Sequence, residues 1–419
     1  MLIRYYLVII ILYVCKFSFA QASSIVYHNK TFNTNIKSIT IKNLVNNNLP
    51  VYFLGDNNKL EFSFDDLEAN YKDLYYTIVH CEANWQESNV SPTQYLNNLN
   101  EDRITDIQSS INTVQKYTHY KFQFPTQNLS PKISGNYILK VFEDGDHEKL
   151  IFTRKIYVVN NASQIDAFIN NSINVDQKST NQRIQLKLNT TTNISNPQRD
   201  LKINILQNLR EDKTQSSNTP SSIIGNTYIY NVRDLFDFKG DNEFRTIDLR
   251  SLRSNSISID SIDNSKKTIY LHPDSFDSNN KYEYKEDNNG KFFVRNLDNS
   301  NPNLESDYID VIFQLNYPNI ENQKIFVGGY FNAYETNHSL NYNTENQKYD
   351  AKIKLKQGIY DYIYFTKKSD ASILGSYFQT ENDYQIFVYY RRPNTHIDEL
   401  IGFKEINSLK HNINNQNRE

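Results

Sequence analysis

Large apolar residues stand at every second position along several stretches of this chain. Residues 60–65, 120–124, 349–355 and 384–390 all show this alternation. A period of two is typical of β-strands, whose successive side chains point to opposite faces. No helix-length apolar periodicity follows the first twenty residues, so the pattern predicts an all-β protein.

Turn signals divide these strands and add one helix to the prediction. Asp144-Gly145 lies between the apolar segments 136–142 and 150–158, and this residue pair favours a β-hairpin. Ser91 followed by Pro92 is typical of a helix cap and first helical position. A short helical insert is therefore expected near residues 93–99.

Polar stretches separate three strand-rich blocks, from which we predict tandem β-sandwich domains. The predicted boundaries are a signal peptide at 1–20, then domains at 21–160, 161–302 and 303–419. Residues 211–222 and 275–289 of the middle block are rich in Ser, Asn, Asp and Lys and are interpreted as surface loops. Whether this middle block forms one domain or two stays open.

The third predicted domain is interpreted as an immunoglobulin-like sandwich, because its alternating strands extend nearly to the end of the chain. Its segment 325–334, IFVGGYFNAY, resembles the start of early-set sandwiches that are fused to glycan-processing enzymes. Tyr334 stands where those sandwiches have Trp.

The N-terminus predicts export. Arg4 precedes an apolar run at 5–14, and Ser18 and Ala20 form a small-x-small cleavage site. We expect cleavage after Ala20. The run is shorter than the roughly 20 apolar residues of a spanning helix, and no later segment approaches that length. Tyr13 and Val14 precede Cys15 where a lipoprotein signal has small residues, which argues against lipidation.

Cleavage would leave Cys81 as the only cysteine, so no intramolecular disulfide is expected. The composition of 31 Tyr and 24 Phe beside 10 Pro and 11 Gly favours strands, since aromatic residues suit pleated surfaces. A net charge of -3 offers no basic footprint for nucleic acid.

The candidate chemical groups do not form a recognisable catalytic arrangement. His80 and Cys81, with distant His119, could indicate a thiol nucleophile or a metal pair. Neighbours on a strand face opposite sides, however, so we interpret Cys81 as a buried structural residue. No catalytic triad, phosphate-binding loop or zinc motif is recognised, and we predict no enzyme activity, metal or cofactor.

The acidic hairpin tip is a candidate calcium site. It contains Asp144, Asp146, His147 and Glu148, but these lack the ordered ligand spacing of a calcium loop. We therefore interpret the tip as a charged turn.

Two aromatic features are candidate binding surfaces. Tyr360, Tyr362 and Tyr364 share one strand face and could contact a partner, while the alternative is that they pack between domains or against the other sheet. Trp85, the only Trp, is interpreted as a core anchor of the first sandwich rather than a ligand platform.

Long motifs in the first and last blocks resemble the type IX secretion system plug protein family of Bacteroidota. In chain order they read YYTIVHCEANW, SPTQYL, SSINTVQKYTHYKFQFP, SGNYILKVFEDGD, LKQGIYDYIYF, GSYFQTENDYQIFVYYRRP and DELIGF. The resemblance implies a periplasmic, non-enzymatic protein that occludes the periplasmic opening of the outer-membrane translocon barrel. It carries no catalytic signature, and we expect the free protein to be monomeric.

A glycan-binding protein with an early-set module is the alternative hypothesis, motivated by segment 325–334. The missing Trp platform and the absence of a recognisable carboxylate pair oppose it. Retention of the protein in a polysaccharide gel would distinguish the two hypotheses.

Overall fold

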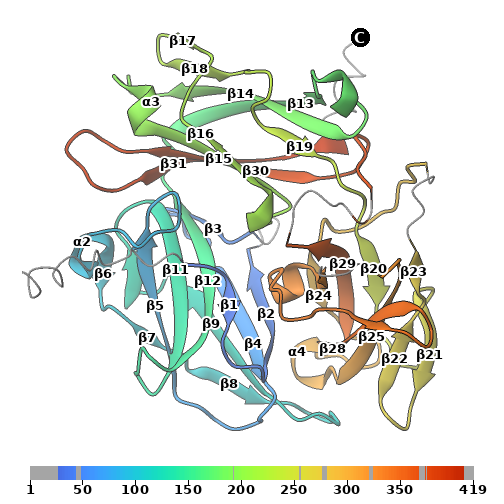
Figure 1. Cartoon of the computed structure of the whole chain (residues 1–419). Coiled ribbons are helices and arrows are strands. Elements are labelled where there is room, and N and C mark those ends of the chain that lie inside the picture. Colours follow the sequence, from blue (N-terminus) through green and yellow to red (C-terminus); the bar gives the residue numbers. More distant parts are fainter. Residues whose placement is uncertain are drawn as a thin grey trace, which may run out of the picture.

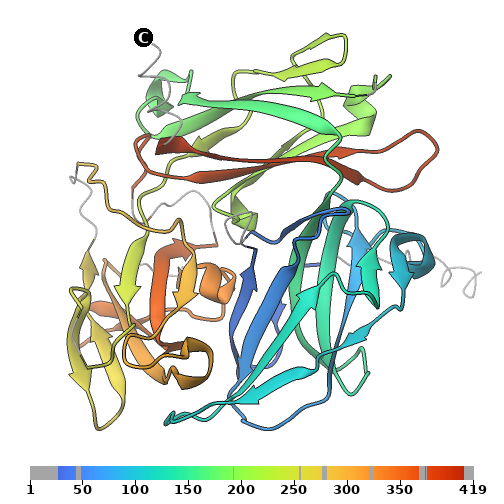
Figure 2. The ribbon, with the colours of Figure 1, turned by 180° about the vertical axis from the view of Figure 1, so that it is seen from behind.

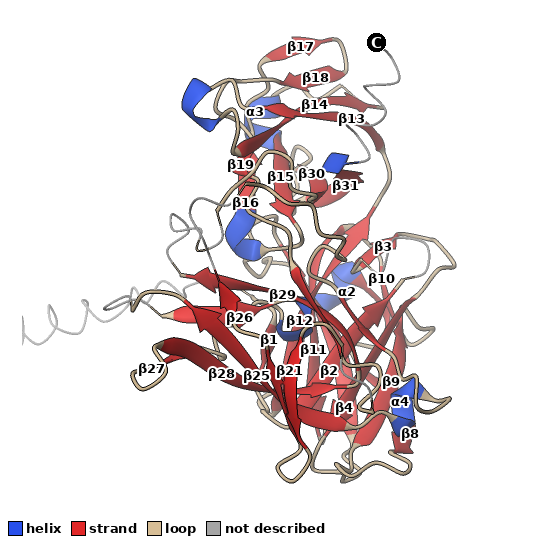
Figure 3. Ribbon diagram, turned by 90° about the vertical axis from the view of Figure 1, so that its right-hand side faces the viewer, coloured by secondary structure: helices blue, strands red, loops and turns tan. Residues whose placement is uncertain are grey.

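Strands form nearly all the regular structure of the protein (Figure 3). The computed structural model describes residues 27–43, 49–191, 193–253, 256–275, 281–319, 324–367, 373 and 375–409. Each α-helix within these residues has only four residues. The predicted all-β fold is thus confirmed, while the predicted signal peptide lies outside the described residues.

The first sandwich packs two sheets around one apolar core. Its larger sheet contains β1 (Lys30–Thr31), β12 (Leu150–Val159), β11 (Gly135–Glu143), β5 (Leu74–Cys81), β7 (Asp102–Arg103) and β3 (Val51–Phe53). The facing sheet contains β2 (Ile36–Lys42), β4 (Leu60–Asp66), β9 (Thr118–Phe124) and β8 (Asp106–Ser109). A small sheet pairs β6 (Leu96–Asn98) with β10 (Leu129–Pro131).

Cross-strand aromatic pairs join β4 to β9 in this core. Phe62 stacks on Phe122 with ring centroids 5.0 Å apart, and Phe64 stacks on Tyr120 at 5.1 Å. These residues belong to the alternating positions that predicted the two strands. Burying them removes large apolar areas from water, which stabilises the sheet.

The predicted turn and helix are both present. Asp144 and Gly145 have φ angles of 57° and 70° between β11 and β12, which are the left-handed values that a tight hairpin turn requires. The helical insert is α2 (Pro92–Tyr95), where the Gln94 side chain accepts a hydrogen bond from the Ser91 N–H. It is shorter than predicted because the next residues form β6.

The middle sandwich is built from two distant parts of the sequence. Its outer sheet contains β13 (Ser163–Asn171), β14 (Asn181–Thr190), β18 (Thr227–Tyr230), β17 (Ser222–Ile224) and β19 (Asp237–Lys239). Its inner sheet contains β16 (Thr214–Ser217), β15 (Leu201–Gln207), β30 (Asp383–Tyr390) and β31 (Glu399–Asn407). Short helical turns are α3 (Pro197–Asp200), η2 (Val175–Gln177) and η3 (Glu211–Lys213).

The third sandwich is inserted between those two parts. One sheet contains β20 (Arg245–Asp248), β29 (Gly358–Thr366), β24 (Phe292–Val294) and β26 (Ile325–Gly328). The other contains β21 (Ile259–Asp263), β22 (Thr268–Leu271), β25 (Tyr308–Asn316), β28 (Lys348–Lys356), β27 (Asn341–Asn343) and β23 (Asp274–Ser275). Two helical turns, α4 (Pro302–Glu305) and η4 (Tyr330–Asn332), lie in its connections.

The strand pairing corrects the predicted boundary between residues 302 and 303. β20 and β24, which precede that point, pair with β29 beyond it. The C-terminal hairpin β30–β31, predicted in the third domain, instead pairs with β15 of the middle sandwich. Local patterns cannot reveal such long-range pairing, because the strands that complete a sheet are chosen by tertiary packing.

One of the two predicted polar loops, residues 211–222, contains a β-strand. Residues 211–222 include η3 and β16, and β16 pairs with β15 at the edge of the inner sheet. The other predicted loop begins at β23, and its residues 281–289 form no strand or helix.

The hairpin β30–β31 lies on the side of the middle sandwich that faces the first sandwich (Figures 1 and 2). All eight residues of β30 are buried. Tyr384, Ile386 and Val388 pack in the core of the middle sandwich, whereas Phe387 and Tyr389 enter a separate apolar cluster with residues of the first sandwich. We call this cluster the junction cluster; its buried members are Leu49, Val51, Ala83, Tyr157, Val159, Leu206, Phe387, Tyr389 and Leu400.

Candidate functional site

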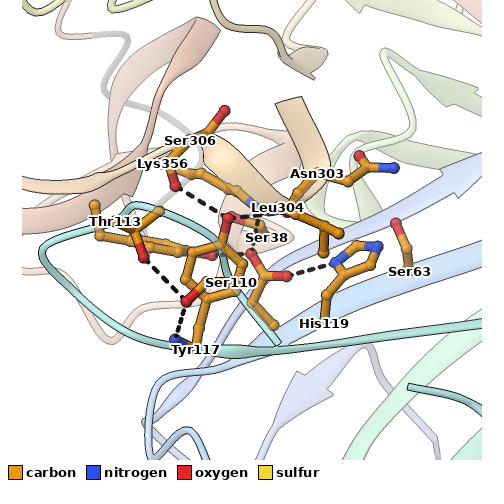
Figure 4. A network of polar contacts seen from close by, with 12 residues as sticks. Ser38, Ser63, Ser110, Thr113, Tyr117, His119, Asn303, Leu304, Ser306 and Lys356 are labelled. Atoms are coloured by element: carbon orange, nitrogen blue, oxygen red, sulfur yellow. Dashed lines mark hydrogen bonds and ion pairs between the residues drawn. The ribbon is translucent and has the colours of Figure 1, made fainter. Parts of the chain in front are cut away.

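A buried polar network joins the first sandwich to the third (Figure 4). Asp65 of β4 is 1% exposed, and its carboxylate lies 2.6 Å from the Lys356 Nζ of β28. The same carboxylate accepts a hydrogen bond from the Tyr308 hydroxyl at 2.6 Å and contacts the His119 Nδ1 at 2.6 Å. Residues separated by up to 291 positions thus meet at one carboxylate.

Helix α4 (with Ser306 after it) and Tyr117 (just before β9) supply further contacts of this network. Lys356 Nζ donates to the Asn303 carbonyl at 2.7 Å and lies 4.2 Å from the centre of the Tyr117 ring. The Tyr117 hydroxyl donates to the carbonyls of Asn303 and Ser306 at 2.9 and 3.1 Å. A desolvated ammonium is stabilised by such acceptors and by an aromatic face.

The electrostatic balance of the network favours an ionised pair. Burial alone would raise the pKa of Asp65, but Lys356 and His119 hold that pKa below its ordinary value. Burial lowers the pKa of Lys356, and the charge of Asp65 opposes this shift. The carboxylate therefore stays ionised at neutral pH and favours the charged ammonium that contacts it.

A cavity of about 370 Å³ adjoins this network at the boundary between the two sandwiches. Its volume falls in the range of small-ligand pockets, roughly 300–1,000 Å³. The lining residues are Ser38, Thr40, Ile41, Lys42, Ser63, Asp65, His119, Leu209, Lys291, Phe292, Phe293, Val294, Arg295, Asn303, Tyr330 and Lys356.

The three tyrosines predicted as a candidate contact surface are buried, which corrects that prediction. Tyr360, Tyr362 and Tyr364 lie in the core of the third sandwich, at 1%, 4% and 3% exposure. Their hydroxyls find acceptors inside the protein: the Lys356 carbonyl for the first and Asp274 for the other two. These acceptors allow the tyrosine face, rather than the isoleucine face, to form the core side of β29.

The predicted reading of Cys81 as a buried structural residue is confirmed. Cys81 is a free, buried thiol, and burial raises its pKa to about 12. His80, its neighbour on β5, instead contacts the Ser88 hydroxyl at 2.7 Å. A thiol with so high a pKa is a poor nucleophile at neutral pH.

Two residues of the β11–β12 turn contact oppositely charged or polar side chains nearby. Asp144 pairs with Lys149 at 2.9 Å, and His147 pairs with Glu101 at 3.1 Å. Among the described residues, no group of three His, Cys, Asp or Glu side chains has an arrangement that could hold a metal ion.

Trp85 and Tyr334 both lie at boundaries between sandwiches. Trp85, predicted in the core of the first sandwich, instead packs at the edge of the junction cluster, with Tyr157 5.2 Å away and the Lys155 Nζ over its ring. Tyr334 contacts Phe365, and the Arg210 guanidinium of the middle sandwich lies over its ring. The Tyr334 ring is thus engaged inside the protein, which removes the aromatic platform considered for glycan binding.

Sequence reasoning missed most of the polar network. Asp65 occupies a polar position of an alternating segment, and Lys356 follows the alternating segment 349–355, so the pattern predicts neither of them as buried. His119 was considered only as a distant partner of His80 and Cys81. No sequence signal marks a polar strand face that is covered by another domain, because the covering domain is set by tertiary contacts.

A pH-sensitive contact joins the first sandwich to the β30–β31 hairpin. Glu82 contacts the Arg391 guanidinium at 2.7 Å and accepts from the Asp398 N–H at 3.0 Å. Burial and the charge of Asp398 raise the pKa of Glu82 to about 7 from 4.5. The folded state therefore binds this proton more tightly than the unfolded state does, and the stability that it contributes is lost as pH rises through about 7.

We predict that Glu82→Gln, which resembles the protonated form, gains stability relative to the parent protein as pH rises from about 5 to about 8. Thermal unfolding of both proteins across this range measures the difference. Glu101→Gln is the matched control, because Glu101 pairs with His147 at an exposed site. A stability difference for Glu82→Gln that does not change with pH would contradict the prediction.

The fold and its buried network define a class of protein: three β-sandwiches that apolar and charged contacts hold together as one body. Comparison with known proteins narrows this class. The family model described as "Type 9 secretion system plug protein 1st domain" matches residues 36–160, which contain every strand of the first sandwich except β1. The chain belongs to the type IX secretion system plug protein family.

A solved structure extends the similarity over most of the chain. It is the crystal structure at 2.30 Å of a hypothetical protein from Parabacteroides merdae ATCC 43184. The two chains are 30% identical with a TM-score of 0.86, and the alignment covers 91% of this chain and 100% of the other. No curated protein matches the chain.

Proposed function

We propose that this protein is a non-enzymatic periplasmic plug that occludes the periplasmic opening of the type IX secretion translocon barrel. The observation that carries the proposal is the family match over residues 36–160. Occlusion of a wide opening requires rigid area rather than chemistry. The buried contacts between the three sandwiches support such rigidity.

The proposed location in the periplasm follows from the predicted signal peptide and from the family. No helix in the described part of the chain is long and apolar enough to span a membrane. In this proposal the protein reaches the translocon through contacts with proteins of the secretion system.

The loop between β8 and β9 is a candidate contact surface of the first sandwich. It exposes two apolar side chains, Ile111 and Val114, at 46% and 64%. Its backbone is nevertheless held in place, because the Ile111 N–H donates to the Leu304 carbonyl at 2.8 Å and the Val114 N–H donates to Asp307 at 2.9 Å. Exposed apolar residues on an ordered loop suit partner recognition, and this loop lies within the matched residues.

We predict that Ile111→Ser combined with Val114→Ser lowers recovery of the translocon barrel by about tenfold or more, the loss expected from two contact residues that each contribute about 1 kcal/mol or more. The measurement is affinity purification of a tagged protein from gently solubilised envelopes, with quantitative mass spectrometry of the co-purified proteins. The substitutions lie on the surface, so folding stability should change little.

Ile223→Ser with Ile224→Ser is the matched control, since both residues are exposed on β17 of the middle sandwich, outside the matched residues. This control should retain the barrel. If the parent protein itself recovers no barrel from extracts that contain it, the plug function is wrong. Equal recovery by both double variants would instead reject only the β8–β9 loop as the contact.

A further inference from the structure

The cavity beside the polar network lies between two strands that are edges of their sheets. β2 is the terminal strand of the order β2-β4-β9-β8, and β24 is terminal in β20-β29-β24. Residues of both strands line the cavity, together with Tyr330 of η4. An unpaired strand edge offers N–H and C=O groups to a further strand.

The hydrogen bonds of β24 identify which backbone groups point outward. The Lys291 carbonyl accepts from the Asp361 N–H at 3.2 Å, and the Arg295 N–H donates to the Gln357 carbonyl at 3.3 Å. The backbone N–H and C=O groups of residues 291 and 295 thus point toward β29, and so do those of residue 293 between them. Backbone direction alternates along a strand, so the N–H and C=O of Phe292 and Val294 point toward the open edge.

The pairing of β2 with β4 identifies the outward backbone groups of β2. The Leu67 N–H donates to the Asn35 carbonyl at 3.0 Å, which shows that odd-numbered residues of β4 face β2. Thr40 and Lys42 of β2 are the register partners of Ser63 and Glu61, so their backbone groups point toward β4. Ile41, between them, therefore directs its backbone groups away from β4. Within the described residues, no hydrogen bond to the outward groups of Ile41, Phe292 or Val294 is found.

Positive charge dominates the cavity wall. The cationic side chains are Lys42, Lys291, Arg295 and Lys356. Lys356 pairs with Asp65, and the Lys291 Nζ lies 3.4 Å from the Asp383 carboxylate. Arg295 forms no ion pair with the described residues, and Lys42 is 3.9 Å from its nearest carboxylate, that of Glu61. The only carboxylate in the wall, Asp65, is already engaged by three partners.

His119 adds an unused polar atom to this wall. Its Nδ1 contacts Asp65, which directs the ring's other nitrogen away from that carboxylate. The residue is 5% exposed, and its Nε2 has no hydrogen-bond partner among the described residues. A buried polar atom without a partner is costly, so a ligand that reaches it would gain a favourable contact.

We propose that this cavity binds an extended acidic segment of a partner protein, which adds as a strand between β2 and β24. Backbone groups of Ile41, Phe292 and Val294 would pair with the segment, as in other cases of strand addition. Its carboxylates would meet Arg295 and Lys42 through charge-assisted hydrogen bonds. The site is a property of the isolated chain and does not depend on the plug function.

Binding of labelled peptides to the purified full chain tests this proposal. The probe is a short fluorescein-labelled peptide of alternating valine and glutamate. The control peptide has lysine in place of each glutamate. Fluorescence anisotropy should show the glutamate peptide binding about tenfold or more tightly than the lysine peptide. Hydrogen exchange should show new protection at the amides of Ile41 and Val294.

Two substitutions separate backbone pairing from charge. Val294→Pro removes an outward N–H without removing a bond to β29, and should weaken peptide binding about tenfold, whereas Val294→Ala keeps the N–H and should bind as the parent does. Arg295→Gln should weaken binding and reduce its salt dependence. Lys266→Gln, on the exposed β21–β22 turn, is the control for charge.

Three results would overturn the proposal. The first is equal affinity for the glutamate and lysine peptides, or no binding of either. The second is unchanged affinity in a folded Val294→Pro protein, since strand addition requires that edge. The third is free glutarate competing as well as the peptide itself, which would identify a small-anion site in place of a strand-binding groove.

Discussion

Lys356→Met is expected to lower the free energy of unfolding by about 3–5 kcal/mol, the cost of leaving one member of a buried ion pair without its partner. Asp65 would then remain buried against β9 with only His119 and Tyr308 as partners. Urea denaturation followed by circular dichroism measures the loss. Because the pair bridges two sandwiches, hydrogen exchange should also increase at the first residues of β25.

Lys352→Met is the matched control on the same strand. Lys352 pairs with Asp310 at 2.6 Å but is 61% exposed, and exposed pairs contribute only about 0–1 kcal/mol. The double variant Asp65→Asn with Lys356→Met should be less destabilised than the sum of its single variants, because no uncompensated charge remains. Equal effects of Lys356→Met and Lys352→Met would show that the buried pair does not hold the two sandwiches together.

Phe387→Ala is expected to lower the free energy of unfolding by about 3–5 kcal/mol and to loosen the junction between the first and middle sandwiches. Phe387 is fully buried, and its ring stacks on Tyr157 with centroids 4.0 Å apart. Tyr157 in turn contacts Trp85, the only Trp of the chain. Tryptophan fluorescence therefore reports directly on this junction, and its emission should shift to longer wavelength in the native variant.

Phe313→Ala is the matched control, because it also removes a buried phenylalanine ring but lies away from the junction. Phe313 is equally buried, but it packs against Tyr362 in the core of the third sandwich. Its loss should destabilise the protein by a similar amount without changing the native emission of Trp85. An unchanged emission in Phe387→Ala would mean that the junction does not depend on this aromatic stack.

The alternation of apolar and polar side chains predicted the positions of individual strands, but it did not predict what covers each face of a strand. In β28 the odd-numbered positions 349–355 are buried as expected. In β30 the intervening positions are buried too, because the other sheet of the middle sandwich covers one face and the first sandwich covers the other. Period-two patterns distinguish the two faces of a strand, but they do not show whether water or another domain covers the polar face.

The sequence also does not show whether polar side chains such as the tyrosines of β29 have hydrogen-bond acceptors inside the protein. Tyr360, Tyr362 and Tyr364 were predicted on one face, and they do share one, yet that face is the core because Asp274 and the Lys356 carbonyl accept their hydroxyl hydrogens. Asp274 lies 88 residues from Tyr362 in the sequence. The sequence around β29 therefore gives no indication that Asp274 accepts these hydrogen bonds.

By itself the sequence determined the all-β class, the hairpin at Asp144-Gly145, the buried thiol of Cys81 and membership of the plug family, because each depends on local periodicity, turn chemistry or ordered motifs. Only the tertiary structure decided that β30–β31 completes the middle sandwich and that Asp65 meets Lys356. It also placed β2 and β24 around one cavity. These features arise from contacts between distant segments, which are selected by the joint burial of surfaces and charges when the whole chain folds.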